Sequence, residues 1–502
     1  MQDRLFRSPV AWRSLVFLVS MSLTFISASA KGEDGPVLRA GVAEVDITPP
    51  LKFPVCGYYH ERLATGTIDP LKAKALVFEQ EAGGKSIRAA LVVCDITGIA
   101  ADLTAEVRRR AAERTGIPAE HIQLSATHSH TGPDYTRHLY EYLADPGKKG
   151  ADGDAPYAEK LISGIVAAIE QAKQAARPAT VEAGSGQQQV PVAFNRRFVM
   201  KDGSVQTWRS LENPNVIRAA GPIDPEIGLV SVKTASGSLA AVLSNFALHL
   251  DTVSGTQWSA DYPYFIEQAV RKAKGDNVVS IFGTGTCGDI NHVNPSSKDR
   301  NKTSFIGGEL GQTIVGALPA LKPIAKPRLR VGSQIVELPL REVSPAETKE
   351  SAAKLAAIQG GMKLDFLEQV AAYRNVMLDE LHRKPPTVNS PKFINWGMTH
   401  QWAGVGANLP VQVHVICVGD DLAIVTLPGE VFVDLGLALK RNSPFKTTLV
   451  IELSNCQETL YIPTRAAYAG GSYEVTNSAL KPGGGEMLVE AALELLRKAA
   501  AE

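Results

Sequence analysis

Apolar runs suited to β-strands alternate along the chain with stretches whose apolar residues recur at helical spacing. Residues 38–47 and 86–96 predict strands, and the second is a continuous apolar run typical of a sheet covered on both faces. Residues 101–115 and 158–176 predict helices. Further strands are expected at 227–234, 239–248, 277–282, 411–418 and 422–426. This alternation predicts an α/β fold with a mixed β-sheet core flanked by helices.

One segment differs from its surroundings and predicts a helical insertion between strands. Ser344 to Glu347 has the residues of a helix start, and the chain then stays rich in Ala, Leu, Lys and Glu to about residue 383. Only Gly360-Gly361 interrupts it, so we expect a helical hairpin over residues 344–383. Residues 485–500 predict an amphipathic helix. No internal repeat is evident in the sequence.

The N-terminus has the features of a secretory signal peptide. Arg4, Arg7 and Arg13 precede an apolar run over residues 14–26, which ends in Ala28-Ser29-Ala30. We expect cleavage after Ala30 and a secreted or periplasmic protein, with an uncleaved anchor as the alternative. No later segment approaches the roughly 18 apolar residues of a membrane helix. On size alone, residues 31–502 could form one large domain or two to three ordinary ones.

Charge and cysteine content exclude several classes of protein. The 502-residue chain has 52 basic and 52 acidic side chains, and loss of a signal peptide with three Arg and one Asp leaves a net charge near −2. Nothing in this charge balance attracts nucleic acid or anionic lipid. The five cysteines are scattered and odd in number, which argues against a disulfide framework or a Cys-rich metal site. The oligomeric state stays open.

A histidine pair follows a predicted strand in the segment Leu124 to Asp134. His128 and His130 are two residues apart, so in an extended stretch both side chains point the same way. Imidazole is the commonest protein ligand for zinc. Alone, such a pair is also compatible with a polar loop or with side chains that only support a metal ligand.

Polar side chains also follow three other predicted strands, where loops usually present functional groups. His249 follows the strand at 239–248, and Glu430 follows the strand at 422–426 in a Pro-Gly-Glu turn. Asp289 and Asn291 follow the strand at 277–282 through a Gly-rich turn. These side chains and the histidine pair are the candidates for a metal-dependent active site.

With these motifs in order, the chain resembles the neutral/alkaline non-lysosomal ceramidases from about Arg39 to Glu474. The motifs that carry the resemblance are Ala40 to Pro50 with Gly57-Tyr58, Thr127 to Pro133, Asn195-Arg196, Phe246 to His249, and Ser454-Asn455 through Tyr461-Ile462, Tyr468 and Tyr473-Glu474.

The resemblance implies a single neutral-ceramidase-like catalytic domain over residues 31–502, which uses Zn²⁺ to hydrolyse the amide bond of N-acylsphingosine. The partner that it implies is a small-molecule or lipid substrate. The family's zinc ligands fall on His128, His249, Glu430 and Tyr461. Such a ligand set leaves room for a water molecule, as a catalytic zinc requires. The residues implied to line the substrate carbonyl and to stabilise an oxyanion are His130, Arg196 and Tyr473, and Asp289 lies in the family's Gly-Asp loop.

The sequence also departs from the family pattern. The Gly-Asp loop of ceramidases continues with a serine and a proline, whereas this chain reads Ile290-Asn291-His292. Because an amide cannot act as a nucleophile, Asn291 excludes a serine acyl-enzyme but allows water as the nucleophile. No C-terminal immunoglobulin-like domain is expected, and residues 344–408, which include Trp396, His400 and Trp402, have no family counterpart.

Two alternatives to ceramide hydrolysis therefore stay open. The first is a zinc hydrolase of another amide or ester, such as a modified sugar, which Asn291 and the missing domain would favour. The second is a catalytically silent binding protein on the same fold.

Overall fold

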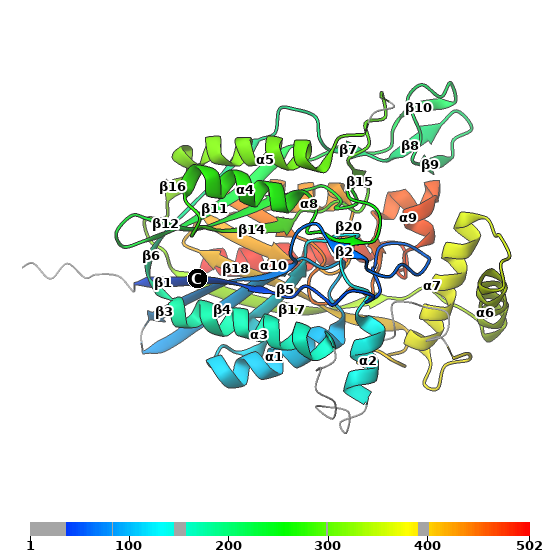
Figure 1. Cartoon of the computed structure of the whole chain (residues 1–502), viewed down its shortest axis with the longest axis horizontal. Coiled ribbons are helices and arrows are strands. Elements are labelled where there is room, and N and C mark those ends of the chain that lie inside the picture. The colour runs from blue at the N-terminus through cyan, green and yellow to red at the C-terminus, as the bar shows by residue number, and fades with distance from the viewer. Residues whose placement is uncertain (1–36, 83, 145–156, 298–299, 390–400) are drawn as a thin grey trace, which may run out of the picture. The chain divides into compact units, whose positions relative to one another are not determined.

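Three successive segments of the chain have the same order of strands and helices in the computed structural model (Figure 1), which describes residues 37–82, 84–144, 157–297, 300–389 and 401–502. Each segment has three antiparallel strands, a helix, a fourth strand parallel to the third, and a second helix. We call these segments the first, second and third units.

The first unit consists of β1 (Leu38–Asp46), β3 (Lys72–Ala82), β4 (Lys85–Cys94), α1 (Ala101–Thr115), β5 (Ile122–Ala126) and α3 (Tyr157–Ala175). The second consists of β6 (Arg177–Gln187), β11 (Glu226–Thr234), β12 (Leu239–Phe246), α4 (Tyr262–Lys274), β14 (Val279–Thr284) and α5 (Thr303–Ala317). The third consists of β17 (Leu329–Pro339), β18 (Asn408–Val418), β19 (Leu422–Thr426), α8 (Val433–Asn442), β21 (Thr447–Ile451) and α10 (Gly484–Ala501).

The strands of the first two units form a nine-stranded mixed sheet in the order β14-β12-β11-β6-β1-β3-β4-β5, with β16 (Lys322–Pro323) paired to β6. The two halves are joined where Arg39 and Ala40 of β1 pair with Arg177 and Pro178 of β6. The third unit forms a separate four-stranded sheet, β17-β18-β19-β21. The predicted mixed sheet flanked by helices is confirmed, and the structure divides it into two sheets.

All three units turn one face of their strands toward a shared apolar core. Leu76, Leu243 and Ile424, one from each unit, are fully or almost fully buried there. The opposite faces are covered by helices, with α1 and α3 on the first unit, α4 and α5 on the second, and α8 and α10 on the third (Figure 1). Because both faces are covered, strands such as β4 are apolar at nearly every position.

Most elements expected from the apolar pattern are present within a few residues of their predicted bounds. The expected hairpin at 344–383 forms α6 (Pro345–Gln359) and α7 (Phe366–His382). Ser344 and Glu347 make a capping box on α6, and Asp365 caps α7. The predicted signal peptide, Trp396 and His400 lie outside the described residues.

The sequence pattern missed both the repeat and several elements, among them α5. This helix carries four glycines, which weaken its helical signal. A Cβ on Gly307 would lie 2.4 Å from a carbonyl oxygen of α4, and one on Gly311 would lie 2.5 Å from Ala269, so the glycines serve close helix packing. The three units share the order and pairing of their strands and helices but no evident sequence repeat. Insertions of different length between the first and second strands of each unit hide the shared order in the sequence.

These insertions occupy the same place in each unit, residues 47–71, 188–225 and 340–407. The first strand of a unit runs parallel to its third and fourth strands, so each insertion emerges at the edge where those two strands also end. The first insertion contains β2 (Gly66–Thr67), the second contains β7 (Phe194–Asn195), β8 (Arg197–Met200), β9 (Val205–Thr207) and β10 (Val216–Ala219), and the third contains α6 and α7. Short elements in other loops are α2 (Thr136–Ala144), β13 (Gln257–Trp258), β15 (Ile290–Asn291), β20 (Glu430–Val431), β22 (Tyr461–Ile462) and α9 (Tyr473–Thr476).

Two further expectations concern membrane helices and cysteines. Among the described helices, none is long and apolar enough to cross a bilayer. All five cysteines are described, and all are free thiols.

Candidate active site

The carboxyl ends of the three fourth strands meet one another. The amide of Ala126 donates to the carbonyl of Leu453 at 3.1 Å, and the amide of Glu452 donates to the carbonyl of Thr284 at 3.0 Å. The hydroxyl of Thr284 closes the set with a 2.8 Å bond to the carbonyl of Thr127. The loops that follow these strands therefore converge at one place.

Each unit contributes one side chain to a buried cluster at this place. His128 follows β5, His249 follows β12, and Glu430 begins β20. The Nε2 atoms of the two histidines are 3.2 Å apart, and Oε2 of Glu430 lies 3.4 Å from the first and 3.2 Å from the second. His128 has a φ of 75°, a backbone conformation that few non-glycine residues adopt, so its orientation is imposed by its surroundings.

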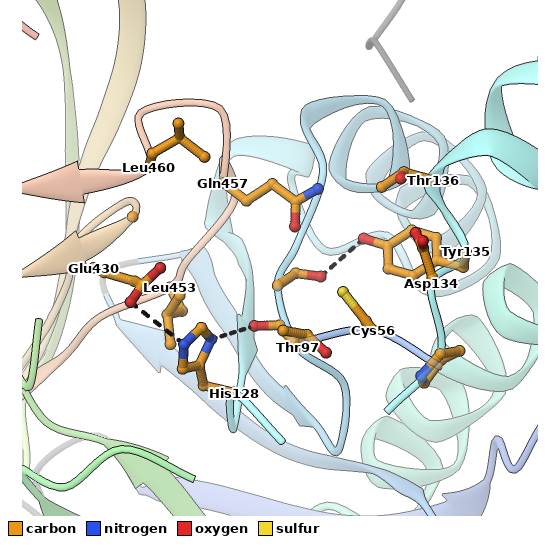
Figure 2. A pocket seen from close by; sticks show the side chains of 13 residues that line it. Cys56, Thr97, His128, Asp134, Tyr135, Thr136, Glu430, Leu453, Gln457 and Leu460 are labelled. Carbon is orange, nitrogen blue, oxygen red and sulfur yellow. Dashed lines mark hydrogen bonds and ion pairs between the residues drawn. The ribbon is translucent and has the colours of Figure 1, made fainter. Parts of the chain in front are cut away.

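The Nδ1 atoms of His128 and His249, on the side of each ring away from Glu430, are both hydrogen-bonded to backbone carbonyls. Nδ1 of His128 donates to the carbonyl of Thr97 at 2.6 Å, and Nδ1 of His249 donates to that of Cys287 at 3.0 Å. Figure 2 shows His128 between Thr97 and Glu430, at the edge of a small cavity of about 30 Å³. Since a carbonyl only accepts, each neutral ring turns a lone pair toward Oε2 of Glu430, a buried oxygen with no hydrogen-bond donor in the described chain.

Three acceptors this close require a cation between them. Burial lowers the pKa of His128, but the nearby carboxylate of Glu430 raises it by more. Burial lowers the pKa of His249, which favours its neutral, ligating form. Burial raises the pKa of Glu430, yet the two imidazoles hold it well below its usual value. The residues therefore fit a bound metal ion, whose ligating histidines in other proteins are commonly held by carbonyls in this way.

His130 is close to the cluster but is held differently. Its Nε2 lies 3.3 Å from Nε2 of His128, and His128, His130 and His249 form a group whose ligand atoms lie within 4.8 Å of one another. In the described residues, no carbonyl accepts from Nδ1 of His130. Burial, followed by the charge of His128, lowers the pKa of His130 to about 3. His130 is therefore a neutral imidazole.

Tyr461 lies beside Glu430 because β20 and β22 pair in parallel with these two residues in register. Its hydroxyl accepts a 3.0 Å hydrogen bond from Nη2 of Arg196. Burial raises the pKa of Tyr461 well above its usual value, and Arg196 opposes this only in part. The phenol oxygen is therefore placed next to the carboxylate of the cluster.

Arg196 is held by three groups around it. Besides the Tyr461 contact, its Nε donates to Glu474 at 2.8 Å and its Nη2 donates to the carbonyl of Gly288 at 2.8 Å. The same Glu474 pairs with Arg197 at 3.0 Å, so one carboxylate faces two buried guanidinium groups. This part of the site has a net positive charge that suits a developing oxyanion.

A cleft of about 840 Å³ opens over these residues, and all three insertions line it. Tyr473 belongs to an aromatic wall, with its ring stacked on Phe366 at 5.5 Å and tilted against Trp208 at 4.8 Å between ring centroids. Most residues of this wall were not predicted from the sequence. The candidates were sought just after predicted strands, and the wall residues in the insertions do not have that position. The remaining lining residues are Gly57, Tyr58, Tyr59, His60, His130, Arg196, His249, Asp251, Ile358, Met362, Lys363, Leu364, Gln369 and Tyr461.

Two candidates from the sequence do not line this cleft. Asp289 accepts from the amide of Val433 at 2.9 Å and from the side chain of Asn195 at 2.8 Å, and burial raises its pKa to about 6. The side-chain oxygen of Asn291 accepts from the amide of Val293 at 3.1 Å. Asp289 thus connects separate segments of the chain, Asn291 makes a local turn, and neither side chain lines the cleft.

Comparison with known proteins identifies relatives of this chain. A "Neutral ceramidase" of Pseudomonas aeruginosa is 29% identical over 237 residues, which are 46% of this chain and 33% of that protein. The matched region thus spans about a third of the relative's length. The crystal structure of neutral ceramidase from Pseudomonas aeruginosa has a TM-score of 0.66 at 21% identity, covering 93% of this chain and 75% of that one.

A second structure, described as a ceramidase complexed with C2, has a TM-score of 0.65 at 19% identity and covers 92% of this chain and 76% of that one. At these identities the two structures show a common fold. The profile of the family "Neutral/alkaline non-lysosomal ceramidase, N-terminal" matches residues 38–303, more than half of the 502-residue chain. The chain therefore belongs to the neutral/alkaline non-lysosomal ceramidase family.

Proposed function

We propose that this protein is an exported, zinc-dependent hydrolase that cleaves the amide bond of ceramide or a related N-acylated lipid. The observation that supports this best is the cluster of His128, His249 and Glu430, three acceptors that need a cation, with His249 lining the 840 Å³ cleft. The family and the N-terminal signal sequence support the substrate class and the export.

For the metal we propose His128, His249, Glu430 and Tyr461 as ligands. The two histidines are the ones whose Nδ1 atoms are held by carbonyls, and Tyr461 is the residue in register with Glu430. Histidine nitrogens and carboxylate oxygens suit zinc. When bound, zinc supplies Lewis acidity and makes water a stronger nucleophile near neutral pH.

The other residues are proposed to bind and orient the substrate. Arg196, fixed by Glu474, and Tyr473, whose pKa burial raises so that it stays an O–H donor, would donate hydrogen bonds to the scissile carbonyl as negative charge develops. His130 would contact the same carbonyl from the other side. The aromatic wall around Phe366 would hold the acyl chain, and water would be the nucleophile because Asn291 cannot be one.

Metal content and hydrolysis test this proposal together. The purified protein should contain about one zinc ion per chain, and His249→Ala should lose it. His121→Ala is the control, since this histidine bonds the carbonyl of Arg88 away from the cluster. Chelator-sensitive hydrolysis of a fluorescent N-acylsphingosine is expected. Full zinc content in His249→Ala would refute the ligand set, and turnover of other amides or esters only would refute the lipid substrate.

A further inference from the structure

The cleft contains an acidic side chain that the proposed reaction does not use. Asp251 lines the cleft together with His130 and His249, and 26% of its side chain is exposed. Its Oδ1 accepts a 3.0 Å hydrogen bond from Nδ1 of His292, a side chain that is only 2% exposed. The second unit thus places a carboxylate at the wall of the cleft and a buried imidazole behind it.

The backbone on both sides of Asp251 is held in place. The carbonyl of Leu250 accepts from the amide of His130 at 3.0 Å. Asp261, at the N-terminus of α4, accepts from the amides of Thr252 at 3.0 Å and Val253 at 3.1 Å. The carboxylate of Asp251 is therefore presented by a rigid segment.

The loop that carries His292 is held as well, and Asn291 is the residue that shapes it. The side-chain oxygen of Asn291 accepts from the amide of Val293, which turns the chain around His292. Ile290 and Asn291 also pair with Asn195 and Phe194. Asn291, which stands where the family pattern has serine, thus helps to shape the loop that holds Asp251.

The Asp251 carboxylate has hydrogen-bonding capacity left over. In the described part of the chain, His292 is the one donor that reaches it, so Oδ2 stays available to a ligand in the cleft. A ligand that covered this oxygen without supplying a donor would pay for its desolvation. The guanidinium of Arg196, which lines the same cleft and is always protonated, makes the site unfavourable for a cationic group. A neutral hydroxyl fits best.

We infer that Asp251, positioned by His292, is a specificity-determining residue that accepts a hydrogen bond from a hydroxyl on the amine half of the substrate. This inference rests on the proposed amide hydrolysis, because it assigns the two halves of the substrate to different walls. The acyl half lies against the aromatic wall of Phe366 and Trp208, and the hydroxylated amine half lies against Asp251.

A matched pair of ligands that cannot be hydrolysed tests it. The octanesulfonyl amides of 2-amino-1,3-propanediol and of isopropylamine differ only in two hydroxyls, and calorimetry measures their affinities for the purified protein. The wild type should bind the diol about 10-fold more tightly or better, as expected for hydrogen bonds to a charged acceptor. In Asp251→Ala the ratio of the two affinities should fall close to one. Asp421→Ala, with a 29% exposed and ion-paired carboxylate far along the chain, should keep the wild-type ratio.

His292 is tested through its effect on that ratio. His292→Leu removes the donor and should lower the preference for the diol, whereas His292→Asn keeps a donor close to Nδ1 and should restore most of it. A purely structural role would instead weaken both ligands equally in both variants.

The outcomes separate this inference from the proposed function. No preference in the wild type, no binding of either ligand, or an unchanged ratio in Asp251→Ala would overturn the role of Asp251. A preference that depends on Asp251 in a protein that hydrolyses no amide would instead keep this role and refute the hydrolase. Zinc-dependent hydrolysis without the preference for the diol would keep the hydrolase and refute the role of Asp251.

Discussion

At the scale of single residues, Glu474 is one carboxylate that forms ion pairs with two arginines. It is fully buried and is the carboxylate that pairs with both Arg196 and Arg197. Removing one partner of a buried ion pair leaves uncompensated charge, so Glu474→Ala should lower the free energy of unfolding by about 3–5 kcal/mol, measured by urea denaturation. Amide hydrolysis should fall as well, because Arg196 loses the group that orients it.

The exposed pair between Lys481 and Glu342 provides the control for this prediction. The Glu342 side chain is 75% exposed, and Glu342→Ala should leave the free energy of unfolding close to the wild-type value. Equal losses in both variants would contradict the proposed importance of burial.

At the scale of elements, the start of α1 is tied to a loop of the third unit. Glu458 accepts from the amide of Ala101 at 3.0 Å, and burial raises its pKa from 4.5 to about 7. A raised carboxyl pKa favours the folded state while the group is protonated. This stabilisation is complete below about pH 4.5 and is lost as the pH rises through 7.

Glu458→Gln should remove this pH dependence because the amide keeps an acceptor but does not titrate. The advantage of the wild type over the variant in free energy of unfolding should shrink by about 3 kcal/mol between about pH 5 and pH 8. Glu113→Gln on the exposed face of the same helix should show no such change. Parallel curves for wild type and Glu458→Gln would contradict the prediction.

The helical hairpin contributes to the cleft through Phe366, the first residue of α7. If its ring holds the acyl chain, Phe366→Ala should raise KM for long-chain amides about 10-fold and leave short-chain amides nearly unchanged, because the apolar contact is lost. Phe305→Ala is the matched control, since that ring is 42% exposed, close to the 40% of Phe366, and lies on α5 away from the cleft. An equal rise for both chain lengths would exclude this role.

At the scale of the whole molecule, three units share one apolar core and meet again at the active site. Ile281 belongs to that core, so Ile281→Ala should lower the free energy of unfolding by about 2–5 kcal/mol. Hydrogen exchange should accelerate in all three units together, within one unfolding transition. Acceleration confined to the second unit would show that the units unfold separately. The exposed Leu51 offers a control whose replacement by Ala should cost less than about 0.5 kcal/mol.

Three residues of the candidate metal site could be noticed from the sequence because each follows an apolar strand, whereas Tyr461 entered only through the family resemblance. His128, His249 and Glu430 sit in loops after β5, β12 and β19, where the end of a local pattern marks them. The strand and helix alternation could be predicted for the same reason, since burial on both faces leaves continuous apolar runs. These are properties of neighbouring residues along the chain.

Only the tertiary structure decided which distant residues meet. The pairing of Asp251 with His292 joins residues 41 apart, and the cleft wall brings together insertions from three units whose topology repeats without a visible sequence repeat. The same holds for Asp289, which connects separate segments, and for Asn291, which makes a local turn, although their position after a strand suggested chemistry. Periodicity reports whether a residue is buried, but the partner of a buried polar group depends on how the strands and insertions pack.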